Sequence, residues 1–208
     1  MPRKICFLKP TGDLLTVVFV AASKTSVEKA FALPQLTQAD VAAADRYRQT
    51  SDKVAHAISA YLKRLYVGDW KAGASGKPVA DGRFFNVSHT DGAVVFVMAE
   101  RDVGIDVERV RPVSDDLKNY VASEAERQAA EENRDFFKVW TAKESLVKAH
   151  GGGLTVDVKT VPALPFDGVK TYKEKAYFSR CLVMGEYVIS VTRVGKEPFD
   201  VKISTLKV

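Results

Sequence analysis

The sequence lacks the features that mark membrane proteins, disulfide-stapled folds and zinc sites. No apolar run reaches the roughly 18 residues of a membrane-spanning helix, and the first residues contain no apolar stretch long enough for a signal peptide. The 208 residues include only two cysteines, Cys6 and Cys181, and three histidines. We therefore expect two buried, reduced thiols, no zinc site, no membrane partner and a cytoplasmic protein.

The chain also lacks a concentrated basic segment. It carries 31 Lys and Arg against 26 Asp and Glu, a net charge of +5. This mild excess favours an anionic partner such as a nucleotide or an acidic protein. No cluster of five or more basic residues and no aromatic-and-basic readout motif occurs, so nucleic acid is not expected as a partner.

Hydrophobic periodicity predicts a mixture of helices and strands. The predicted strands are Lys4–Leu8, Leu14–Val20, Phe84–Ser88, Ala93–Ala99, Val103–Glu108, Ala176–Val183, Tyr187–Val194 and Val201–Leu206. The predicted helices are Asp40–Arg48, Ser51–Tyr66, Ser114–Val121, a short helix that starts with a capping box at Ser123, and Phe136–His150, which the three glycines 151–153 end.

Short connections between the strands from Phe84 to Glu108 predict an antiparallel meander. Both halves of the chain offer helices followed by antiparallel strands, and strand starts at Gly92 and Gly185 are alike. We predict an α+β fold of two similar subdomains, 1–101 and 102–208, each an antiparallel sheet with packed helices.

The segment Gly104-Ile105-Asp106-Val107-Glu108 contains two acids at alternate positions. Side chains alternate faces along a strand, so Asp106 and Glu108 point away from the core together. Two adjacent carboxylates repel unless positive charge lies between them. A divalent ion such as magnesium supplies that charge, and the alternative is a solvated face with arginine partners at Arg109 and Arg111.

A second candidate lies on the last predicted helix. Trp140, Glu144 and Lys148 are four residues apart and share one stripe of the helix. The simplest interpretation of Glu144 and Lys148 is a surface ion pair. A third candidate is Lys77-Pro78 followed by Phe85-Asn86-Val87-Ser88-His89; neighbours in a strand point apart, which disfavours a catalytic Ser88–His89 pair and favours a phosphate contact for His89.

These motifs occur together and in order: Lys77-Pro78, residues 85–89, residues 104–108, and Trp140 followed by Lys143-Glu144-Ser145 and Lys148. The combination closely resembles the signature of Sfp-type 4′-phosphopantetheinyl transferases. The resemblance extends through Gly151-x-Gly153-Leu154 into the strand-rich tail and is least clear over the first ~70 residues.

The resemblance implies that coenzyme A lies in the cleft between the two subdomains. It assigns Mg²⁺ on the coenzyme pyrophosphate to Asp106, Glu108 and Glu144. It places Lys148 on the same pyrophosphate. It implies contacts with the phosphates of the adenosine half from Lys77, Ser88 and His89, and further basic contacts from Arg46, Arg48 and Lys53.

The resemblance further implies transfer of 4′-phosphopantetheine to a serine of an apo carrier protein, with release of adenosine 3′,5′-bisphosphate. Glu144 is the expected proton acceptor, directly or through a metal-bound water. The carrier (acyl, polyketide or peptidyl, and by analogy of secondary metabolism) is expected to pack near the helices between Ser114 and Asp135, so that charge reversals there raise its KM. A monomer suffices for such a site.

Three other functions remain possible on the sequence. The chain could be a binding module of the same fold without catalysis, although the acids and Lys148 are present. It could be another magnesium enzyme of nucleotide chemistry, although no GxxxxGK[ST] loop occurs. It could be a nucleic-acid-binding protein, as its basic pI of about 9.1 permits.

Overall fold

The computed structural model describes residues 13–73, 76–130, 132–153 and 156–208. The predicted strand Lys4–Leu8 and Cys6 lie outside them. In the amino-terminal half the elements are β1 (Leu14–Ala21), α1 (Val27–Phe31), α2 (Gln38–Asp45), α3 (Thr50–Tyr66), β2 (Lys71–Ala72), β3 (Pro78–Val79), β4 (Phe84–Thr90) and β5 (Ala93–Ala99). They are followed by β6 (Val103–Arg109), α4 (Asp115–Val121), α5 (Glu124–Gln128), α6 (Asn133–His150), η2 (Val158–Thr160), β7 (Gly168–Tyr172), β8 (Lys175–Met184), β9 (Tyr187–Val194) and β10 (Asp200–Thr205).

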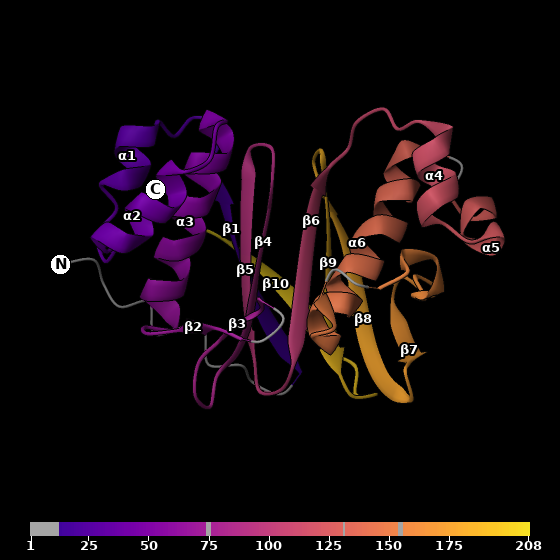
Figure 1. Ribbon diagram of the computed structural model, residues 1–208. Helices are drawn as coiled ribbons and strands as arrows, with labels where there is room; N and C mark the ends of the chain where they lie inside the picture. Colours follow the sequence, from indigo (N-terminus) through magenta and orange to yellow (C-terminus); the bar gives the residue numbers. More distant parts are fainter. Residues whose placement is uncertain (1–12, 74–75, 131, 154–155) are drawn as a thin grey trace.

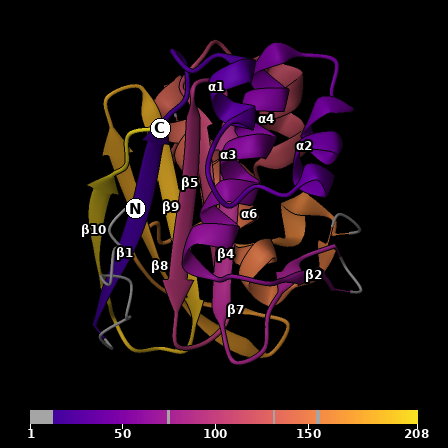
Figure 2. The same cartoon turned by 90° about the vertical axis from the view of Figure 1, so that its left-hand side faces the viewer.

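Two four-stranded sheets face each other, and each is covered on its outer side by helices (Figure 1). The first sheet has the order β10-β1-β5-β4 and packs against α1, α2 and α3; the second has the order β6-β9-β8-β7 and packs against α4, α5 and α6. The view in Figure 2 shows α3 in front of the first sheet and α6 behind it. The predicted α+β fold with two sheet-rich subdomains is confirmed.

The core between the sheets follows from strand alternation. Leu15 and Val17 of β1, Val95 of β5 and Ile105 of β6 are fully buried between the two sheets, while Val18 and Phe96 face the helices on the other side of the first sheet. Strand β5 is therefore apolar on both faces, which explains its unbroken apolar sequence.

The predicted meander is confirmed for β4 and β5, which pair antiparallel, and is wrong for β6. Both edges of β5 are already occupied by β1 and β4, so the chain passes into the second sheet, where β6 pairs with β9. The last strand, β10, returns to the first sheet and pairs parallel with β1. The division at residue 101 stays a prediction, and β10 lies beyond it in sequence.

Helix boundaries follow their capping residues. Ser123 and Glu126 form the predicted capping box at the start of α5, and Gly151 ends α6 in the left-handed conformation with φ of 80°.

Cys181 is a free, partly exposed thiol. Within the described ranges, the helices are all too short or too polar to cross a bilayer.

Candidate active site

Strand β6 presents its two acids on one face, as the alternation predicted. Ile105 and Val107 are buried between the sheets, and Asp106 and Glu108 point to the opposite side, toward α6. Strand β4 lies beside β6 at the edge of the other sheet, and Asn86 accepts a hydrogen bond from the Ile105 N–H at 3.0 Å. The site is therefore built where the edge strands of the two sheets meet.

Asp106 is the most deeply buried acid of this site. It is 5% exposed, and its Oδ1 accepts hydrogen bonds from Ser88 Oγ at 2.7 Å and from Lys148 Nζ at 2.6 Å. Lys148 also donates to Ser88 Oγ at 3.1 Å. Asp106 Oδ2 is buried and has no hydrogen-bond partner among the described residues, a costly state for a carboxylate oxygen unless a ligand occupies it.

Glu108 has partners of its own. Its Oε2 accepts from Thr90 Oγ1 at 3.1 Å and from Arg111 Nη1 at 2.9 Å. The Arg111 guanidinium lies 4.8 Å from the centre of the Phe137 ring. The arginine alternative for this acid is thus realised by Arg111, whereas Arg109 pairs with Asp91 and Glu186 instead.

Helix α6 brings Glu144 and Lys148 to β6 because Gly104 lets the helix lie directly on the strand. A Cβ atom at Gly104 would lie 2.0 Å from the Ser145 carbonyl oxygen and 2.4 Å from Ala149 N. Glu144 is half-buried, and no hydrogen bond of its carboxylate is found among the described residues. Burial, and then the charges of Asp106 and Glu108, raise the pKa of Glu144, against the lowering effect of Lys148.

His89 points away from Ser88, so the two form no catalytic pair. Its ring lies edge-on to His56 at 4.8 Å between centroids, and His56 stacks on Tyr47 at 3.7 Å. Desolvation by surrounding atoms and the charge of Lys148 lower the pKa of His89. Burial and the charge of His89 lower the pKa of His56 to about 4, so the His56 ring is a neutral hydrogen-bonding group at neutral pH.

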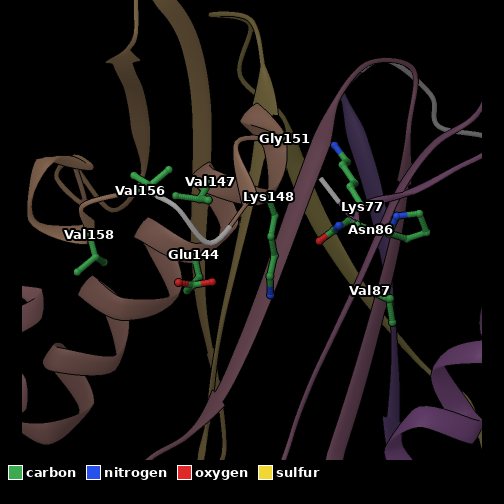
Figure 3. A pocket seen from close by; sticks show the side chains of 12 residues that line it. Lys77, Asn86, Val87, Glu144, Val147, Lys148, Gly151, Val156 and Val158 are labelled. Carbon is green, nitrogen blue, oxygen red and sulfur yellow. The ribbon is translucent and has the colours of Figure 1, made fainter. Parts of the chain in front are cut away.

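A cavity of about 290 Å³ opens beside Lys148 between the two halves of the chain. Lys77, Pro78, Asn86 and Val87 line one side, and Glu144, Lys148 and the glycine-rich end of α6 line the other. Figure 3 shows Lys148 between Glu144 on one side and Asn86 and Val87 on the other. Lys77, which also pairs with Asp102 at 3.3 Å, thus shares this cavity with Glu144 and Lys148.

A second cavity of about 410 Å³ lies between α2 and α3. Its lining combines several hydrogen-bond donors, namely Arg46, His56, Lys63 and Trp70. Burial lowers the pKa of Lys63 to about 8, and its Nζ lies 3.6 Å from the centre of the Trp70 ring. Of the three predicted basic contacts, Arg46 lines this cavity, Arg48 is exposed and is not part of the lining, and Lys53 pairs with Asp45 at 2.5 Å.

The three predicted metal ligands do not converge into a ready-made cluster. Across the described ranges, no group of three or more His, Cys, Asp or Glu side chains is arranged to hold a metal ion. Two observations still fit a divalent cation: the buried Oδ2 of Asp106 has no partner among the described residues, and the pKa of Glu144 is raised by burial first and then by the negative charges of Asp106 and Glu108. Carboxylate oxygens are also the donors that Mg²⁺ prefers.

A buried ion pair that no sequence motif predicted supports α6. Lys143 is fully buried, and its Nζ lies 2.8 Å from Glu126 Oε2 and donates to the Val158 carbonyl at 3.0 Å. Glu126 also accepts from the N–H groups of Ser123 and Ala163. Burial alone would raise the pKa of Glu126, but the hydrogen bond from Lys143 and these N–H groups hold the pKa below its usual value. In the sequence, the capping-box position of Glu126 was the one indication that this acid has a structural role.

Replacing Lys143 with methionine is expected to lower the free energy of unfolding by about 3 kcal/mol, because it leaves the Glu126 charge buried and unpaired. Urea unfolding at pH 7 measures the loss. The control Lys138→Met removes a partly exposed pair with Asp135 on the same helix and should cost less than about 1 kcal/mol. Equal losses in both variants would contradict this role.

The pH dependence of this pair has a defined sign. Because the pKa of Glu126 is lowered by folding, its stabilisation is present above the unfolded pKa of about 4.3 and is lost as the pH falls through the lower folded value. The stability difference between Lys143→Met and the wild-type protein should therefore shrink in acid below about pH 4.

The fold and the site together define a two-subdomain α+β protein whose acids and lysines meet in a cleft between two sheets. Residues 102–192 match the family model described as the 4′-phosphopantetheinyl transferase superfamily. Over this segment the chain is therefore similar to that superfamily, and the resemblance to Sfp-type members that the motifs indicated is confirmed as a resemblance.

Several similar proteins are named 4′-phosphopantetheinyl transferases. The chain is 30% identical over 123 residues to 4′-phosphopantetheinyl transferase psf-1 of Bacillus pumilus, covering 52% of this chain and 51% of that protein. It is 35% identical over 95 residues to gsp of Aneurinibacillus migulanus (41% and 39%) and 32% identical over 105 residues to AcpT of Salmonella typhi (45% and 55%). The chain thus spans about half the length of the curated relatives it matches.

Proposed function

We propose that this protein transfers the 4′-phosphopantetheine arm of coenzyme A to a serine of an apo carrier protein, releasing adenosine 3′,5′-bisphosphate. The contact that carries the proposal is Lys148 Nζ with Asp106 Oδ1 at 2.6 Å, beside the unpartnered Oδ2. A buried acid next to a lysine and a second, half-buried acid in a cleft is a suitable site for a polyphosphate and its counterion.

In this proposal Asp106, Glu108 and Glu144 hold Mg²⁺. When bound, the ion neutralises charge on the pyrophosphate. Lys148 binds a pyrophosphate oxygen through its ammonium group, and Ser88 keeps Lys148 and Asp106 in place through its hydroxyl. Arg111 would have to share Glu108 with the ion, since it donates to the same carboxylate.

Glu144 is the proposed acceptor of the serine proton. Its carboxylate faces the cavity, and burial raises its pKa, which makes it a stronger base. The serine oxygen then attacks the β-phosphate of coenzyme A, and the bond to the adenosine bisphosphate oxygen breaks. No nucleophile from this chain is required.

The adenosine half of coenzyme A carries further anionic groups, for which the donors described above are available. Lys77 lines the first cavity, and His89 lies beside His56 at the border of the second. We propose that Lys77 contacts a phosphate at the first cavity, and that His89, Arg46 and Lys63 do so at the second. Ser88 donates its only hydroxyl hydrogen to Asp106, so the phosphate contact expected of it would require that bond to break. Arg48 and Lys53 are proposed only as contributors to the surrounding positive potential.

A mass measurement tests the function. The full chain is incubated with coenzyme A, Mg²⁺ and an apo carrier, and the carrier is weighed. The expected result is a gain of one phosphopantetheine; no gain with several acyl, polyketide and peptidyl carriers, while the enzyme is folded, would reject it. Binding of coenzyme A without transfer would favour a non-catalytic module, and turnover of another nucleotide a different magnesium enzyme.

The proposed carrier surface lies on α4 and α5, beside α6 (Figure 1). Segment 114–135 contains seven acidic and three basic residues, so attraction of an acidic carrier to this segment would not come from its net charge. It exposes two apolar side chains instead, Leu117 and Tyr120, the latter 68% exposed. An exposed tyrosine of this kind is typical of protein-binding surfaces.

Replacing Tyr120 with serine is expected to raise the KM for the carrier about fivefold or more, because an aromatic contact is lost, and to leave the KM for coenzyme A unchanged. Steady-state kinetics with each substrate varied measure both. Val183→Ser, which removes another exposed apolar side chain from β8, is the control. An unaltered carrier KM in Tyr120→Ser would remove α4 from the docking surface.

We further propose, from the sequence, that the protein is a monomer and that it is located in the cytoplasm.

A further inference from the structure

Helix α6 is attached to the second sheet by a row of buried hydroxyl groups, which we call the hydroxyl ladder: Thr141, Ser145, Ser179, Ser190 and Thr192. None is more than 1% exposed. Thr141 Oγ1 lies 2.8 Å from Ser190 Oγ, and Ser145 Oγ lies 2.8 Å from Thr192 Oγ1. Ser179 Oγ lies 2.9 Å from the same Thr192 oxygen. The ladder lies outside the cavities described above.

The ladder has a fixed direction of donation. Thr141 donates its only hydroxyl hydrogen to the Phe137 carbonyl at 2.8 Å, so it must accept from Ser190. Ser145 donates to the Ala142 carbonyl at 3.0 Å, so it accepts from Thr192, which in turn accepts from Ser179. Every member is therefore satisfied without water.

The spacing of the ladder matches a helix that runs along a strand. Thr141 and Ser145 are four residues apart, about 6 Å along a helix axis. Ser190 and Thr192 are two residues apart, about 6.6 Å along a strand. Two contacts at this separation set both the direction and the axial position of α6, because a shift along β9 would break both.

The ladder position is coupled to the site through β6. Asp106 pairs with Ser190 across the sheet, and Gly104 pairs with Thr192. The rung at Ser190 therefore lies next to Asp106, and the rung at Thr192 lies next to the glycine on which α6 rests. Glu144 precedes Ser145, and Lys148 reaches back toward the start of the helix to contact Asp106.

We propose that the hydroxyl ladder is a positioning device that holds α6 at one register along β9, so that Lys148 and Glu144 meet Asp106. Apolar packing alone does not select a register, since it is non-directional, whereas hydrogen bonds tolerate only small displacements. The structural part of this inference is independent of the reaction; its effect on turnover rests on the proposed function.

A stability experiment tests the structural part. The coupling between Lys148 and Asp106 is measured by a double-mutant cycle (Lys148→Met, Asp106→Asn) in urea, in the wild-type protein and in Thr141→Val/Ser190→Ala. Valine is similar in shape to threonine, and removing the Thr141 and Ser190 hydroxyls together leaves neither of them without its partner. The coupling is expected to fall by roughly half or more; an unchanged coupling would overturn the proposal.

A kinetic experiment tests the consequence. Thr141→Val/Ser190→Ala and Ser145→Ala/Thr192→Val/Ser179→Ala are each expected to lower kcat about tenfold or more, because Glu144 is displaced. Thr141→Ser/Thr192→Ser, which keeps every hydroxyl, should retain wild-type kcat. The control Ser26→Ala removes the cap of α1 and should leave kcat unchanged.

Equal losses of kcat in the control and in the ladder variants would overturn the proposal, because they would reflect stability alone. Full kcat in both ladder variants would do the same. If the wild-type protein transfers nothing, the proposed function fails, and the coupling measurement still decides whether the ladder positions α6.

Discussion

Replacing Gly104 with alanine is expected to force α6 away from β6 and to lower the free energy of unfolding by more than about 4 kcal/mol. The new Cβ would lie 2.0 Å from the Ser145 carbonyl oxygen, 2.4 Å from Ala149 N and 2.9 Å from Lys148 Cβ. The first two of these atoms belong to the helix backbone, which cannot move aside as a flexible side chain does. A shift of α6 would also separate Lys148 from Asp106.

Chemical denaturation, followed by far-UV circular dichroism, measures this loss, and coenzyme A binding reports on the site. The matched control is Gly152→Ala, where the added Cβ would meet only side-chain atoms, His150 Cδ2 at 3.2 Å and Val156 Cγ2 at 3.5 Å. That change should alter stability by about 1 kcal/mol or less. Wild-type stability in Gly104→Ala would show that direct packing of α6 on β6 is not required.

Replacing Glu144 with glutamine is expected to lower kcat for the proposed transfer at least about 100-fold, because the variant loses both the proposed proton acceptor and a negative charge in the cleft. The fold should be retained: the carboxylate has no hydrogen bond with a described residue, and its charge is destabilised by burial and by Asp106. Loss of activity without loss of stability is the signature of a residue kept for chemistry.

Carrier mass gain under single-turnover conditions measures the rate, and urea unfolding verifies the fold. Glu197→Gln is the control, since Glu197 is an exposed carboxylate paired with Arg101 at 2.9 Å and should leave turnover unchanged. Full activity of Glu144→Gln would remove Glu144 from the mechanism. A variant that binds coenzyme A normally but transfers nothing would assign it to the chemical step.

Patterns of a few consecutive residues were sufficient to predict side-chain direction along a strand and the end of a helix. The alternation around Asp106 and Glu108 predicted correctly that both acids point away from the apolar core between the sheets. Neighbouring side chains on a strand must point to opposite faces. The glycine after His150 predicted the end of α6, because it adopts the left-handed conformation there. Both predictions depend on a few consecutive residues.

The sheet to which β6 belongs could not be read from its neighbours. A three-residue connection after β5 predicts a hairpin, but β1 and β4 already occupy both edges of β5. The parallel pairing of β10 with β1 could not be read from neighbouring residues either, because the two strands are far apart in the sequence. Strand pairing depends on which distant segments occupy the same sheet edges. The periodicity within one segment does not predict that outcome.

The sequence by itself determined which faces the acids, Glu144 and Lys148 occupy, and the order of motifs that indicates the superfamily. Only the tertiary structure decided their partners: Lys148 and Ser88 on Asp106, Arg111 and Thr90 on Glu108, and Glu126 on Lys143. The physical reason is range. A side chain's direction is fixed by its own backbone, whereas its partner is fixed by how α6, β4 and β6 pack, which residues far apart in the chain determine together.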